Sequence, residues 1–206
     1  MSLLTEFRDE ARHRGALGAD EAVTLASAFR VVRDLPYAPA TNDAPEAALR
    51  EWRGTAFGKH ALLEAILDGL GTDCALILAT HHYSVEDTPW LAPALLDEVR
   101  RGPVPDVHTF LRVCSDPVAD EWMTVDATWP LATRTLGLPV NETLTPDVDQ
   151  RIACMVEEIV HIPGDEEPAD VYQRILALHA DGEVERHARF IDALSSWLAA
   201  ATGDVR

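Results

Sequence analysis

Residues 51–63 read Glu51-Trp52-Arg53-Gly54-Thr55-Ala56-Phe57-Gly58-Lys59-His60-Ala61-Leu62-Leu63 and join a glycine-containing turn to the front of a strongly apolar helix. The apolar face continues through Ile66, Leu67 and Leu70, so the spacing predicts a central helix from about Ala56 to Leu70. Side chains in the first turn of a helix lie in the field of its unpaired N–H groups, which favours a reactive anion there. The residue at this position is Ala56, which has no reactive group.

The composition indicates a folded protein with an acidic surface. The chain has 206 residues, of which 47% are hydrophobic and 25% charged, enough for one domain with a sizeable core. Its 35 acidic and 17 basic residues give a net charge of −18, which repels phosphate backbones and anionic lipid surfaces. We therefore expect neither nucleic acid nor a membrane as a partner.

The cysteines and the N-terminus indicate a cellular compartment. Cys74, Cys114 and Cys154 are widely spaced and form no CxxC pair, which favours reduced thiols over a disulfide framework or a zinc site. The first fifteen residues are too charged for a signal peptide, and no apolar run approaches membrane-spanning length. The sequence thus predicts a soluble cytoplasmic protein, with no metal and no other cofactor.

Around the central helix, the patterns predict a mixture of helices and short strands. Helical spacing predicts helices at residues 2–14, 20–33, 45–50, 91–100, 147–161, 169–180 and 183–201. A buried strand is expected at 74–79, and a hairpin from 107–113 and 122–125. The predicted fold class is α+β, with residues 1–140 as a core that includes the N-terminal helices. Residues 141–206 are expected to form a C-terminal helical extension packed on that core.

The hairpin brings two side chains of chemical interest together. If its turn is centred on Pro117, His108 lies opposite Asp126. Directly opposed residues have Cβ atoms about 4.5–5.5 Å apart, close enough for a carboxylate to hold an imidazole. Such a pair fixes the tautomer of the histidine and supports it as a general base. A cysteine at position 56, across a cleft from this pair, would complete a thiol triad.

Several motifs of the chain resemble those of one family. Arg53-Gly54-Thr55-Ala56-Phe57-Gly58-Lys59-His60-Ala61-Leu62-Leu63 resembles the motif R-G-T-C-x-x-K-x-x-L-L of transglutaminase-like, papain-fold proteins of bacteria. Val107-His108-Thr109-Phe110-Leu111 resembles their histidine strand, and Trp122-Met123-Thr124-Val125-Asp126-Ala127-Thr128-Trp129 their tryptophan-and-aspartate strand. Leu35-Pro36-Tyr37 resembles a segment that commonly precedes the cysteine. The resemblance covers roughly residues 20 to 130, and the motifs occur in the family's order.

The resemblance implies a papain-like/transglutaminase-like core, with the central helix packed on a small antiparallel sheet. It also implies that His108 is the catalytic base, that Asp126 orients it, and that the N–H of residue 56 contributes to an oxyanion hole. Substrates would be peptides, or amides and thioesters of a small molecule or a carrier, with water, an amine or a carbanion as the acceptor. We expect Trp129 and Tyr37 to line the cleft, and Lys59 to pair with a substrate carboxylate or an acidic neighbour.

Ala56 departs from the family at its nucleophile. A methyl group cannot attack a carbonyl, and loss of a triad nucleophile can cost on the order of 10⁶ in rate. Two origins of Ala56 stay open, an engineered cysteine-to-alanine change and a natural loss. Three functions stay open as well: a thiol acyl-transfer or amide- and thioester-processing enzyme by descent, inactive at this position; a pseudoenzyme that binds a ligand or acts as a scaffold; and an enzyme that uses His108 and Asp126 as a non-covalent general base.

Other reactive residues have simpler interpretations. Cys114 is six residues from His108, about 20 Å along a strand, while Cys74 and Cys154 are expected in the core. His81-His82 and the Glu158-x-x-His161 pattern suggest a metal, but di-metal helical sites need a second copy of that pattern. A solvated helix face is therefore expected at residues 157–161.

Overall fold

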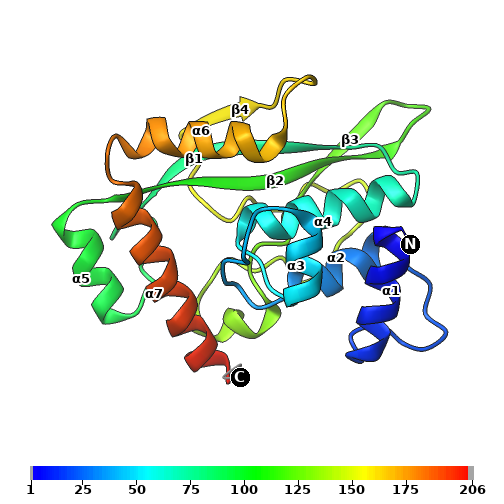
Figure 1. Cartoon of the computed structure of the whole chain (residues 1–206), viewed down its shortest axis with the longest axis horizontal. Helices are drawn as coiled ribbons and strands as arrows, with labels where there is room; N and C mark the ends of the chain where they lie inside the picture. The colour runs from blue at the N-terminus through cyan, green and yellow to red at the C-terminus, as the bar shows by residue number, and fades with distance from the viewer. Residues whose placement is uncertain (1, 204–206) are drawn as a thin grey trace.

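A four-stranded antiparallel sheet forms the centre of the computed structural model, which describes residues 2–203. The sheet order is β3-β2-β1-β4, with β1 at Cys74–Tyr83, β2 at Val104–Asp116, β3 at Glu121–Val125 and β4 at Glu158–His161. The two long strands β1 and β2 lie in the middle, as Figure 1 shows. Together with the helices, this sheet confirms the α+β class.

Helix α4 (Ala56–Gly69) packs against β1 and β2 and contacts three N-terminal helices: α1 (Leu3–His13), α2 (Leu25–Arg33) and α3 (Pro45–Glu51). Its residues Leu62, Leu63, Ile66 and Leu67 are fully buried in the main core, as the apolar spacing predicts. Thr55 occupies the N-cap position, with extended backbone and no side-chain hydrogen bond to the helix. The first turn of α4 therefore keeps N–H groups that no cap side chain satisfies.

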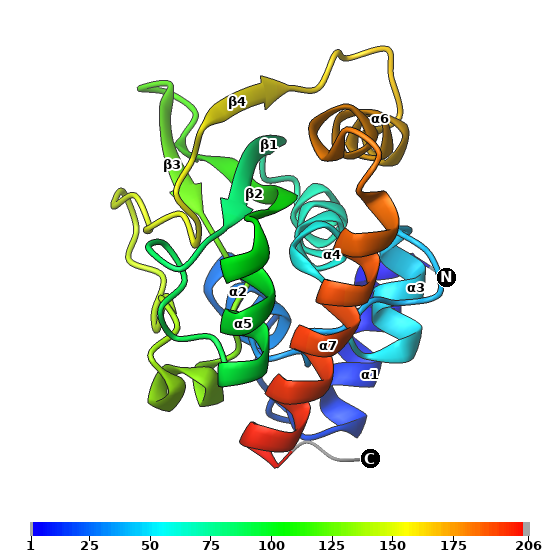
Figure 2. The same ribbon diagram turned by 90° about the vertical axis from the view of Figure 1, so that its left-hand side faces the viewer.

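The second half of the chain adds α5 (Pro93–Arg101), the short 3₁₀ helix η1 (Leu131–Leu136), α6 (Pro168–Ala180) and α7 (Val184–Thr202). Helix α6 contacts β2 and β1, and α7 contacts β2, α5 and η1. In Figure 2, α7 runs in front of α4. No helix among residues 2–203 is both long enough and apolar enough to cross a bilayer.

The predicted helix at 147–161 is wrong, so the C-terminal extension is helical only from residue 168 on. The apolar stripe of the predicted helix does not pack as one face: Ile152 packs against the sheet, whereas Met155 is 60% exposed and Ile159 48%. The segment instead satisfies its backbone on the sheet, because Gln150 N–H donates to Thr124 O and β4 pairs with β1. Backbone pairing thus prevails over helical spacing here.

Candidate functional site

His108 and Asp126 form a buried hydrogen-bonded pair. Nε2 of His108, on β2, lies 2.8 Å from Oδ2 of Asp126, and the two residues are 4% and 2% exposed. The pairing was predicted, but the predicted direct opposition is wrong. Leu111 pairs with Val125, so a continued ladder would place residue 128, two positions further on, opposite His108. A shift of two positions keeps the same face of a sheet, which is why the side chains still meet.

Backbone groups hold the Asp126 carboxylate from both sides. Oδ1 accepts the N–H of Thr128 at 3.0 Å, and Oδ2 accepts the N–H of Ala153 at 2.8 Å. Burial alone would raise the pKa of Asp126, but His108 and His60 hold it well below its ordinary value. The carboxylate is thus charged at neutral pH and fixes the His108 ring.

His60 is a site residue that the sequence analysis missed. Its Nδ1 lies 2.7 Å from the Ala56 carbonyl oxygen, and its Nε2 accepts the N–H of Ala127 at 2.9 Å. These partners require a neutral ring with the proton on Nδ1. Burial lowers the pKa of His60 to about 4, so the neutral form prevails at pH 7. The i, i+4 spacing from Ala56 was the signal in the sequence.

Lys59 lies in the core and has no contact available for a substrate carboxylate. It is fully buried, and Nζ donates to the carbonyl oxygens of Arg33, Leu35 and Thr128 at 2.7, 3.0 and 2.8 Å. Burial lowers its pKa to about 7, a decrease that the carboxylates of Asp34 and Asp126 limit. These bonds use all three N–H groups of an ammonium, so Lys59 ties α2 to the segment after β3.

Ala56 and His108 line different cavities. Ala56, 6% exposed at the start of α4, lines one of about 290 Å³ together with Tyr37, Asp106 and His187. A second cavity of about 430 Å³ is lined by His108, His81, Cys154 and Trp129, among others. Of the three predicted triad positions, His108 and Asp126 are joined by a hydrogen bond, whereas Ala56 lines the other cavity.

The two aromatic residues predicted at the cleft pack against each other with their rings tilted. The ring centroids of Tyr37 and Trp129 are 4.6 Å apart, and Tyr37 lines the Ala56 cavity while Trp129 lines the His108 cavity. Nε1 of Trp129 is buried and has no hydrogen-bond partner among residues 2–203. An indole N–H without a partner is a donor available to a ligand.

Asp106 is a second buried carboxylate that the sequence analysis missed. It lies opposite His81 in the β1–β2 ladder, and its Oδ2 is 3.2 Å from Nε2 of His81. Its Oδ1 is 2.7 Å from Nε2 of His187, on α7. Burial raises its pKa, but the bonds to His187 and His81 outweigh this and hold the pKa well below its ordinary value. Asp106 thus links the C-terminal helix to the sheet.

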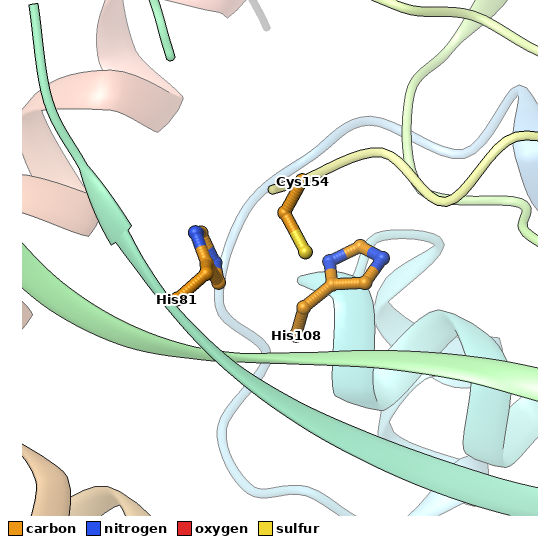
Figure 3. A group of neighbouring side chains, drawn as sticks. All are labelled: His81, His108 and Cys154. Atoms are coloured by element: carbon orange, nitrogen blue, oxygen red, sulfur yellow. The ribbon is translucent and has the colours of Figure 1, made fainter. Parts of the chain in front are cut away.

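Two groups of side chains have the composition of a metal site. The ligand atoms of His81, His108 and Cys154 all lie within 4.8 Å of one another, as do those of His82, Glu157 and His179. Figure 3 shows the Cys154 sulfur pointing toward the His108 ring, between the two imidazoles. Cys154 comes from the loop before β4, where a core helix was predicted. Burial, with Asp126 and Asp106 nearby, raises the pKa of its thiol.

The second group lies on the other side of β1. Nδ1 of His82 is 2.7 Å from Oε1 of Glu157, and Nε2 of His179 is 2.9 Å from the His81 carbonyl oxygen. Glu157 is 49% exposed at its side chain, so the hydrogen bond between His82 and Glu157 is in contact with solvent. In comparisons with known proteins, no family model, no curated protein sequence and no solved structure matched this chain.

Proposed function

We propose that the protein is transglutaminase-like by descent and hydrolyses an amide or a thioester, with His108 and Asp126 activating water in place of a thiol. The observation that carries the proposal is the buried bond of 2.8 Å between His108 and Asp126, beside a cavity of about 430 Å³. Two backbone N–H groups also hold the carboxylate. A pair fixed this firmly supports a working base rather than a remnant.

The packing supports the papain-like part of this proposal. Helix α4, which begins at the position of the family nucleophile, packs on an antiparallel sheet whose strand β2 carries His108. Asp126 follows the next strand of the hairpin. The order helix, histidine strand, aspartate strand is the order that the motif resemblance implies.

The chemistry follows from the orientation of the His108 ring. Its Nε2 bonds to Asp126, so a proton held there leaves Nδ1 free to accept one. As water transfers its proton to Nδ1, its oxygen bonds to the substrate carbonyl carbon, and Asp126 stabilises the imidazolium. The C–N or C–S bond then breaks, and the imidazolium returns the proton to the departing amine or thiolate. Trp129 Nε1 is a candidate donor to the carbonyl oxygen.

Hydrolysis should depend on His108. We expect the chain to hydrolyse members of a panel of acyl thioesters and peptide anilides, and His108→Ala to lower the rate by roughly 10²–10⁴-fold, the contribution typical of a general base. His82→Ala is the matched control, since His82 lies on the other side of β1, in a solvent-exposed hydrogen bond to Glu157. Rates are compared by release of thiol or aniline at saturating substrate. Equal rates for the His108→Ala and His82→Ala variants would exclude the proposal.

A second candidate is a binding protein without turnover. It is favoured by the cavity at Ala56, because Tyr172 of α6 and His187 of α7 line it together with the start of α4. A ligand held there would contact both halves of the chain. A binding protein would hydrolyse no member of the substrate panel, and the cavity at Ala56 would only hold the ligand.

The variant Ala56→Cys tests the descent shared by both candidates. The three native thiols have raised pKa values because of burial, so they should react slowly with iodoacetamide at pH 7. The introduced thiol lies in the first turn of α4, where uncapped N–H groups favour a thiolate with a pKa below its usual ~8.5. We expect one equivalent of fast alkylation that wild-type protein lacks. A reaction rate that rises with pH like that of an ordinary thiol would count against a preserved nucleophile position.

A further inference from the structure

The cavity beside His108 contains three metal-ligating side chains that come together from separate segments. His81 lies on β1, His108 on β2, and Cys154 on the loop before β4 (Figure 3). Their ligand atoms are within 4.8 Å of one another. Around a tetrahedral zinc ion, with bonds of about 2.0–2.3 Å, neighbouring ligand atoms lie roughly 3.5 Å apart. A separation of up to 4.8 Å is about 1 Å wider than a closed zinc site needs, so small movements of these segments bring the three atoms to ligand distance.

Both histidines have the outer partner that metal-bound histidines use. Nε2 of His108 bonds to Asp126 at 2.8 Å, and Nε2 of His81 bonds to Asp106 at 3.2 Å. Neither ring makes a further side-chain hydrogen bond to any residue in the range 2–203, so Nδ1 of each is available. A carboxylate behind a metal-bound imidazole fixes its tautomer and orientation and raises its basicity. His187, bonded to Asp106, and Ala153, bonded to Asp126, hold these carboxylates in turn.

We propose that His81, His108 and Cys154 bind a divalent transition metal ion of the zinc class, with a fourth position open to the cavity. Two imidazoles and a thiolate suit zinc, whereas magnesium and calcium prefer oxygen ligands. Three protein ligands with one open position is the arrangement of catalytic rather than structural zinc. All three ligands line the cavity of about 430 Å³, so a water at the fourth position would face it.

The inference rests on the proposed function only for the reaction that such a water performs. When Nδ1 of His108 binds the metal, His108 can no longer accept a proton from water. The metal takes over the activation, because a metal-bound water ionises near pH 7. Metal binding itself is independent of turnover. The same geometry suits one competing interpretation, in which Cys154 is a nucleophile with His108 as its base. That interpretation gives His81 no role.

The full-length chain, stripped with a chelator and dialysed, tests the proposal with Zn²⁺ and Co²⁺ as probes. We expect one equivalent of either metal per chain, and a thiolate-to-cobalt charge-transfer band in the Co²⁺ protein. Cys154→Ser should remove the band, and His81→Gln should weaken Zn²⁺ binding by roughly 100-fold or more. Asp106→Asn, which leaves all ligands in place, should weaken it by about 10–100-fold. His82→Gln and Cys114→Ser are controls that keep both the band and the affinity.

The outcomes separate the inference from the proposed function. Failure to take up metal, or a band that persists in Cys154→Ser, overturns the inference, as does unchanged affinity in His81→Gln. Cys154 is only partly buried in a loop, so its serine variant should keep the near-ultraviolet circular dichroism of the wild type and remain interpretable. Hydrolysis that survives in chelated protein supports the His108 base of the proposed function and overturns only the catalytic role of a metal-bound water. Metal binding that meets all the expectations, without turnover, supports the inference and removes the proposed hydrolysis.

Discussion

Replacing Lys59 by methionine should lower the free energy of unfolding by about 4 kcal/mol or more. The substitution fills similar volume but leaves three buried carbonyl oxygens, of Arg33, Leu35 and Thr128, without their donor. An unsatisfied buried acceptor costs about 1–3 kcal/mol, and three of them lose their partner at once. The carboxylates of Asp34 and Asp126 also lose the cation that interacts with them. Removing the lysine alone is costly because its buried partners remain. Only the replacement of all partners by apolar groups could leave the stability unchanged.

Urea unfolding, followed by circular dichroism, measures this effect. Leu63→Met is the matched control, since Leu63 lies on the same helix, is fully buried in the main apolar core and has no side-chain group that forms hydrogen bonds. Such a volume-conserving exchange should cost under about 1.5 kcal/mol. A loss below about 1 kcal/mol for Lys59→Met would show that water or a rearranged backbone satisfies the carbonyls.

Acidification from about pH 7.5 to about pH 5 should remove about 2 kcal/mol of stability through His60 alone. The pKa of His60 is about 4 in the folded chain, against ~6.5 in an unfolded chain. Between these values the unfolded chain binds more protons, so stability is present above ~6.5 and is lost as the pH falls toward 4. Asp106 and Asp126, whose pKa values the fold lowers, reduce stability only below about pH 4.

The variant His60→Gln isolates this contribution. Glutamine cannot be protonated in this range, yet its amide offers a donor for the Ala56 carbonyl and an acceptor for the Ala127 N–H. The stability difference between the two pH values should shrink by about 2 kcal/mol relative to the wild type. Identical pH dependence in both proteins would mean that His60 has the same pKa in the folded and the unfolded chain, against the lowered pKa expected from its burial. Chemical denaturation at each pH gives both quantities.

Local patterns in the sequence predicted the centre of the fold. The spacing of Leu62, Leu63, Ile66 and Leu67 gave α4 to within a residue at its end, because these residues all pack on one core. The hairpin was predicted from its apolar runs, and with it the meeting of His108 and Asp126. The register was wrong by two positions because the turn lies at residues 117–120, between Asp116 and Glu121, and is not centred on Pro117.

The rest of the site depends on contacts between distant segments. Cys154 reaches His108 only because the loop before β4 bonds to Asp126 through Ala153, and this segment has the spacing of a helix. Asp106 meets His81 because β1 pairs with β2. It meets His187 because α7, about eighty positions further along the chain, packs beside β2. Lys59 lies in a segment that resembles a family motif. Its structural role comes from hydrogen bonds to three carbonyl oxygens of other segments. Sequence periodicity carries no information about such tertiary contacts.

The burial of Lys59 also determines how the chain can be modified. It is the only lysine in the sequence, so the folded chain presents no ε-amino group to solvent. Acetylation, ubiquitin-type conjugation and isopeptide cross-linking all require that amine, so none of them can act on a lysine of the native protein. The same amine becomes a reporter when the core opens. Its acylation by an amine-reactive ester would record global unfolding at a single known position.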